Sequence, residues 1–132
     1  MRASKLLTVL FVFCNVALPV YSLSCYKVNS FENGIVEKTM CTAYYETVSG
    51  DATFSGLNVT PALRLKIDYN FESEEDCQLQ RVKLLDGSYM GMWACFCATP
   101  MCNYPFSYAE FSARGHTLRP VPIPVPHPVE SQ

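Results

Sequence analysis

Residues 93–104 read WACFCATPMCNY, so Cys95, Cys97 and Cys102 lie close together and Asn103 follows the last of them. The whole chain has 132 residues and seven cysteines. The chemistry of such a cluster depends on the compartment, because thiols stay reduced in the cytosol and form disulfides in exported proteins. The first question is therefore whether this chain is exported.

The N-terminus has the order of features of a secretory signal peptide. Arg2 and Lys5 come first, the uncharged run 6–20 follows, and small Ser22 offers a cleavage site. A signal anchor that stays in the membrane is the alternative, but the run is shorter than the roughly 20 residues of a spanning helix. We expect residues 1–22 to be removed, together with Cys14.

Six cysteines remain, and an even number in a small exported chain predicts disulfides. They are Cys25, Cys41, Cys77, Cys95, Cys97 and Cys102. A zinc site built from the last three is the alternative. However, zinc ligands are usually spaced C-x-x-C and often include histidine, whereas His116 and His127 lie far along the tail. We therefore expect no metal, no cofactor and no reactive thiol.

Size and charge narrow the class of protein further. Residues 23–103 form an expected domain of about 80 residues, a size at which a single core is marginal and covalent staples are common. Without Arg2 and Lys5 the chain has eight Lys/Arg and twelve Asp/Glu, a net charge of −4. This balance argues against nucleic acid or an anionic membrane as the main partner.

The strand pattern is clearest in residues 63–71, LRLKIDYNF, where apolar and polar side chains alternate. This alternation predicts a half-buried antiparallel strand, because successive side chains of a strand point to opposite faces. Residues 42–49, rich in β-branched and aromatic side chains, are the expected partner. Nothing in 23–103 has the periodicity of a helix, so the expected fold class is all-β.

Two turn signals complete a prediction of three successive hairpins. Asn33-Gly34 is expected at the turn of the first hairpin and Asp86-Gly87 at the turn of the third, because these residues tolerate positive φ.

The hairpins also indicate how the cysteines pair. Cys25 and Cys41 stand at the bases of the first hairpin, and Cys77 and Cys95 at those of the third. Linking Cys95 to Cys97 would strain the bridge, since side chains two apart on a strand point in parallel. Among fifteen connectivities, the simplest is Cys25–Cys41, Cys77–Cys95 and Cys97–Cys102.

The run CFCATPMCN resembles the closing signature of the three-finger superfamily, in which two near-adjacent cysteines, four residues and Cys-Asn end the domain. That superfamily includes snake neurotoxins, lymphocyte-antigen and urokinase-receptor-type domains, and activin-type receptor ectodomains. The resemblance covers about residues 24–103 and implies a small disulfide-rich three-finger fold with a structural Asn103. The sequence departs from the superfamily in two ways: Phe96 is inserted between the near-adjacent cysteines, and no cysteines remain for the disulfide that usually joins fingers one and two.

We expect partners to bind at the loop 49–61, the predicted tip of the second hairpin, through Phe54 and Leu57, which have little core to hide in. The alternative is that Phe54 folds back onto Tyr44 or Tyr45. Asn58 begins an N-glycosylation triplet, whose occupancy Pro61 lowers. A sugar there would shift binding to the third hairpin, where Trp93 is expected to pack structurally.

The remaining segments are expected to be solvated. The acidic run 72–76 reads as a turn, with weak calcium binding as a remote alternative. Residues 104–132 are expected to form a flexible tail, first aromatic and then Pro-rich, because dense proline favours an extended polyproline coil. The alternative is that the aromatic residues before the prolines pack back on the cystine-stapled end of the domain. The tail lacks the apolar run that is exchanged for a lipid anchor, so neither an anchor nor a transmembrane segment is expected in the mature chain.

We therefore expect a secreted, extracellular binding module that acts as a ligand or modulator of a cell-surface receptor or channel. The alternative is a soluble activin-receptor-type ectodomain that binds a growth-factor-like ligand. An enzyme is not expected, because general-base catalysis needs a positioned titrating group and both histidines lie in the tail.

Overall fold

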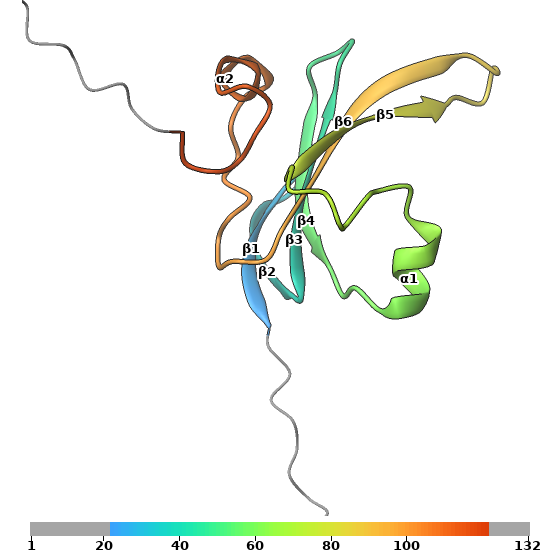
Figure 1. Cartoon of the computed structure of the whole chain (residues 1–132). Coiled ribbons are helices and arrows are strands. Elements are labelled where there is room, and N and C mark those ends of the chain that lie inside the picture. Colours follow the sequence, from blue (N-terminus) through green and yellow to red (C-terminus); the bar gives the residue numbers. More distant parts are fainter. Residues whose placement is uncertain (1–21, 122–132) are drawn as a thin grey trace, which may run out of the picture.

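The computed structural model describes residues 22–121; residues 1–21 of the expected signal peptide and the Pro-rich residues 122–132 lie outside this range. The described chain forms a six-stranded antiparallel sheet with two short helices, so the all-β fold class is confirmed (Figure 1). The elements are β1 Leu23–Val28, β2 Asn33–Lys38, β3 Met40–Glu46, β4 Ala52–Leu57, α1 Pro61–Lys66, β5 Cys77–Lys83, β6 Tyr89–Cys97 and α2 Tyr108–Ala113.

The strand order is β2-β1-β4-β3-β6-β5. Since every neighbouring pair is antiparallel, β1, β3 and β5 run in the same direction. The three hairpin turns, residues 29–32, 47–51 and 84–88, therefore lie at one end of the sheet, which we name the turn end. The half-cystines lie toward the opposite end, which we name the cystine end.

Three disulfides staple the cystine end: Cys25–Cys41, Cys77–Cys95 and Cys97–Cys102. This is the pairing predicted from the hairpins. Cys77 stands directly opposite Cys95 in the register of β5 and β6. In the chain-entropy model, a bridge that closes a loop of about 15 residues contributes roughly 3 kcal/mol, a large share of the stability of a small domain.

The turn of the first hairpin differs from the prediction, whereas that of the third agrees with it. Asn33 and Gly34 belong to β2, and the chain reverses four residues earlier, starting at Asn29, whose backbone N–H donates to the Glu32 carbonyl at 2.9 Å. In the third hairpin, Gly87 takes the expected positive φ of 86° between β5 and β6.

The strand expected over 63–71 is wrong, because residues 61–66 form α1 instead. Thr60 caps this helix by accepting a hydrogen bond from the Leu63 N–H at 3.2 Å, and Pro61 occupies the first turn, where its missing N–H costs nothing. The strand expected as its partner, β3, also has no free edge, because β3 pairs with β4 on one side and β6 on the other.

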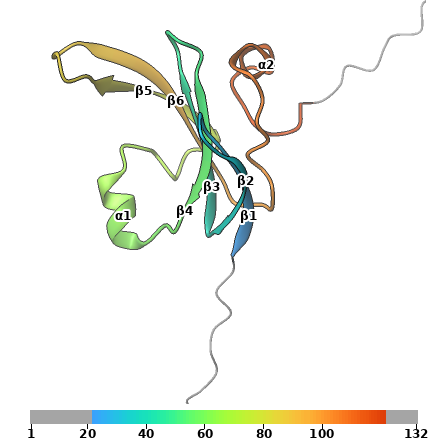
Figure 2. The same ribbon diagram turned by 180° about the vertical axis from the view of Figure 1, so that it is seen from behind.

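The C-terminal segment covers one face of the sheet, and α1 lies on the opposite side, as both views show (Figures 1 and 2). The Phe111 side chain of α2 is fully buried and stacks on Tyr45 with ring centroids 4.1 Å apart. The Tyr45 hydroxyl donates to the Phe106 carbonyl at 3.1 Å. Residues 104–121 are therefore not a flexible tail, and the alternative in which their aromatic side chains pack back on the domain describes the structure.

The other face carries a smaller aromatic cluster. Phe96 of β6 contacts Tyr69 and Phe71, with ring centroids 4.4 and 5.4 Å away. Tyr69 donates its hydroxyl to the Asp76 carbonyl at 2.8 Å, which holds the segment between α1 and β5 against the sheet.

Asp76 corrects the expectation that the acidic run 72–76 is wholly solvated. Its side chain is buried and accepts hydrogen bonds from the Thr117 hydroxyl at 2.8 Å and the Leu118 N–H at 2.9 Å. These two bonds supply the partners that a buried carboxylate needs. Asp76 therefore fastens the C-terminal segment to the start of β5.

The side-chain amide of Asn103 connects three strands by hydrogen bonds. Its fully buried side chain accepts from the Tyr26 N–H at 2.9 Å and donates to the carbonyls of Tyr26, Thr42 and Ser55 at 2.9–3.0 Å. These residues belong to β1, β3 and β4. The expected structural role of Asn103 agrees with this geometry, which connects the first two hairpins without a further disulfide.

Candidate functional site

Each turn at the turn end presents a solvent-exposed apolar side chain. Phe31 in the first turn is 96% exposed, Val48 in the second is 85% exposed, and Leu85 in the third is fully exposed. We name Phe31, Val48 and Leu85 the turn-end surface. Single exposed apolar residues are common, but one in each of three turns at the same end makes this end the strongest candidate for a contact with another protein.

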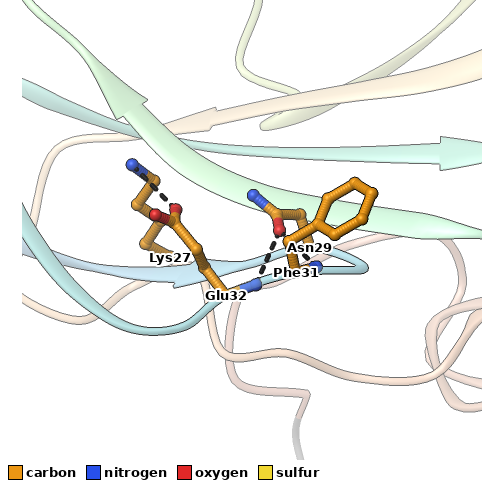
Figure 3. A network of polar contacts seen from close by, with 4 residues as sticks. All are labelled: Lys27, Asn29, Phe31 and Glu32. Carbon is orange, nitrogen blue, oxygen red and sulfur yellow. Dashed lines mark hydrogen bonds and ion pairs between the residues drawn. The ribbon is translucent and has the colours of Figure 1, made fainter.

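Phe31 stands on a turn that is held by side-chain bonds (Figure 3). The Asn29 Oδ1 atom accepts from the N–H groups of Phe31 and Glu32, both at 2.8 Å, which is an Asx turn. Lys27 and Glu32 form an ion pair at 3.0 Å across the base of the turn. The Phe31 ring makes none of these bonds and stays in solvent, while the backbone of its turn is already ordered and does not have to be ordered when a partner binds.

The other two turns are similarly tied. The Thr47 hydroxyl, beside Val48, donates to the Gly91 carbonyl of β6 at 2.9 Å, which joins the second turn to the third hairpin. In the third turn, the Ser88 hydroxyl donates to Asp86 at 2.6 Å, and this bond lowers the pKa of the Asp86 carboxyl. Asp86 therefore stays ionised beside Leu85 at neutral pH.

Phe54 does not lie at a loop tip as expected. It belongs to β4, is only 3% exposed, and packs edge-on against Tyr45 with ring centroids 5.6 Å apart. Leu57 ends the same strand opposite Met40 and is half-buried. The second hairpin turns at residues 47–51, and Phe54 therefore lies in a strand and not at the tip. The alternative in which Phe54 packs on Tyr45 describes the structure.

The other predicted residues lie away from the turn end. Asn58 follows β4 and is exposed, and its side chain accepts from the Thr39 N–H at 3.3 Å. Trp93 of β6 is half-buried, stacks on His116 at 4.3 Å and meets Phe111 edge-on. This packing agrees with the structural role expected for Trp93.

Sequence reasoning missed Phe31 and Leu85, although both carry a local signal. Asn29 is a residue type that bonds to the backbone two positions ahead, so NSFE at 29–32 is a plausible turn with an outward aromatic. Leu85 directly precedes the predicted Asp86-Gly87 turn. The strand wrongly expected at 63–71 lengthens the loop 49–61 in the predicted fold, and this loop therefore becomes the expected contact.

The described residues contain no group of three or more His, Cys, Asp or Glu side chains arranged to hold a metal ion. Between residues 22 and 121, no helix has both the length and the apolar character needed to cross a membrane. The turn-end surface therefore remains the candidate site. It offers apolar side chains for contact, with the charged residues Lys27, Glu32 and Asp86 in or next to the same turns.

The sheet and its bridges define a small, disulfide-stapled all-β domain. The sequence profile of the family described as EGAP4-like C-terminal domain matches residues 24–115, and the chain belongs to this family. The match includes α2, in agreement with the folded C-terminal segment. No curated protein and no solved structure matches the chain significantly.

Proposed function

We propose that the chain is a secreted extracellular binding module of the three-finger type, whose turn end contacts a cell-surface receptor or channel as a ligand or modulator. Three hairpins that leave one cystine-stapled end support the three-finger assignment. The run Cys97, four residues, Cys102 and the buried Asn103 supports it as well. The disulfides support an extracellular location.

One observation carries the binding proposal: the 96% exposed Phe31 ring on a turn fixed by Asn29. Burying a phenylalanine side chain is worth about 1.5–3 kcal/mol, and aromatic anchors of this kind dominate many interfaces. Because the backbone of this turn is already held, binding does not have to order it. Phe31 therefore provides the main apolar contact, and Val48 and Leu85 extend it.

Saturable binding of the fluorescently labelled chain to live cells tests this proposal. Phe31→Ala is expected to weaken binding about 30-fold, the equivalent of about 2 kcal/mol. Leu65→Ala is the matched control, because Leu65 is 90% exposed but lies on α1, outside the turn end. Equal losses in both variants, or no loss in Phe31→Ala, would contradict the proposal.

A further inference from the structure

A cleft of about 650 Å³ lies at the cystine end, apart from the turn-end surface. The segment between α1 and β5, the end of β6 with its following loop, and residues 118–120 form its walls. Its lining includes Tyr69, Phe71, Phe96, Met40, Met101 and Arg119. The volume is within the range of small-ligand and peptide sites.

One wall of the cleft is aromatic and is held in place. The Tyr69 and Phe71 rings meet at 4.8 Å, and both contact Phe96. The Arg64 guanidinium lies over Phe71, 4.8 Å from the ring centroid. Thr99 and Arg119, whose side chains carry hydrogen-bond donors, also line the cleft, together with the acidic residues Glu75 and Asp76.

This combination fits a proline-rich segment. Aromatic-lined grooves bind polyproline II helices because prolyl rings stack on aromatic faces and the helix is already ordered. Prolyl residues have no N–H, so their peptide groups present only carbonyls. Among the lining residues, Thr99 and Arg119 can donate to such carbonyls, whereas the carboxylates of Glu75 and Asp76 cannot.

The chain's own sequence continues as such a segment directly after the last lining residue of the cleft. Pro120 is itself a lining residue, and residues 121–132 continue as VPIPVPHPVESQ. The bonds of Thr117 and Leu118 to Asp76 fix the point from which this segment starts. Twelve residues at 3.1 Å each would reach about 37 Å in the polyproline II conformation, and a short tether gives millimolar effective concentrations.

We propose that the cleft is a polyproline-binding site and that its occupant is the chain's own segment 121–132. The site does not depend on the function of the turn end, because none of its lining residues belongs to the three turns. Proline-rich segments of other proteins would compete for it only when the chain's own segment leaves.

A labelled synthetic peptide of residues 121–132 tests the proposal by fluorescence anisotropy. It is expected to bind the chain that lacks residues 122–132, and to bind the full chain at least tenfold more weakly, because the tethered segment competes. A peptide with alanine at positions 122, 124 and 126 should lose binding. Failure of the native peptide to bind the shortened chain would overturn the proposal.

Three variants of the shortened chain locate the site. Phe71→Ala should weaken peptide binding at least tenfold. Ala98→Arg, at an exposed lining residue, should block the cleft without removing an aromatic contact, which guards against misfolding of the first variant. Leu79→Ala, on exposed β5 outside the cleft, should bind normally. Unchanged peptide binding in Ala98→Arg would show that the peptide does not bind in the cleft. A dimer of the full chain that disappears when residues 122–132 are removed would show that the segment docks on a second copy and not within one chain.

Discussion

Replacing Asn103 by aspartate tests what joins the first two hairpins. The amide donates from Nδ2 to three carbonyls at 2.9–3.0 Å and is fully buried. Aspartate has nearly the same shape, but it places a carboxylate oxygen against those three carbonyl oxygens. An uncompensated buried charge costs about 3–5 kcal/mol. For a domain of this size, that corresponds to a fall in Tm of more than about 10 °C.

The effect should depend on pH in a defined direction. The carbonyls disfavour the charged form, so the pKa of the new carboxyl is raised in the folded state above its unfolded value of about 3.9. The penalty is therefore smallest below about pH 4 and grows as the pH rises through the folded pKa.

The assay is equilibrium denaturation with intact disulfides at two pH values, with Asn33→Asp as control. Asn33 is exposed on β2, so its substitution should change the free energy of unfolding by less than about 0.5 kcal/mol. A chain in which Asn103→Asp is as stable at pH 7 as Asn33→Asp would refute the reasoning, because the buried amide would then not hold the strands together.

Three further predictions concern the C-terminal segment and the bridges. Asp76→Asn should lower the free energy of unfolding by about 1–3 kcal/mol and speed hydrogen exchange at Leu118, since it removes charged acceptors; unchanged exchange would contradict this. Burial, followed by the charge of Glu110, raises the pKa of the Tyr45 hydroxyl. The stability that the neutral hydroxyl contributes is therefore complete below about pH 10 and is lost as the pH rises above this value. In urea titrations, Tyr45→Phe should reduce this alkaline fall in the free energy of unfolding. Removing both Cys97 and Cys102 should cost about 2 kcal/mol by denaturation, less than removing Cys25 and Cys41 at about 3, because the closed loop is shorter; the reverse order would contradict the loop-entropy account.

The bridges and the first and third hairpins could be predicted from the sequence because their signals are local. Cys77 and Cys95 flank a turn marked by Asp86-Gly87, and strand geometry alone decides which cysteines are able to meet. The second hairpin could not be placed in the same way. The alternation at 63–71 predicts a strand of this hairpin. The structure instead forms α1 there, because Thr60 caps the helix and β3 is already paired on both sides.

The burial of the C-terminal segment depends on contacts that are distant in sequence. Phe111 has no periodic partner in its own segment, and its burial follows from Tyr45, which lies far earlier in the chain. Phe54 differs from this case, because its partner Tyr45 lies on the neighbouring strand of the same hairpin and only the strand wrongly expected at 63–71 places Phe54 in a loop. Phe31 is the opposite case. The local sequence predicts the Asx turn that carries it, but no hydrophobic pattern marks its side chain as a contact.

The central claim is that apolar side chains at the turn end bind a cell-surface partner. A chain carrying both Phe31→Ala and Leu85→Ala tests it most directly by surface binding to live cells, with the native chain as unlabelled competitor. The account predicts that the double variant folds with an unchanged Tm and loses saturable binding by more than about 100-fold, since two anchors are removed. Binding of the folded double variant with the affinity of the native chain would show that another surface makes the contact.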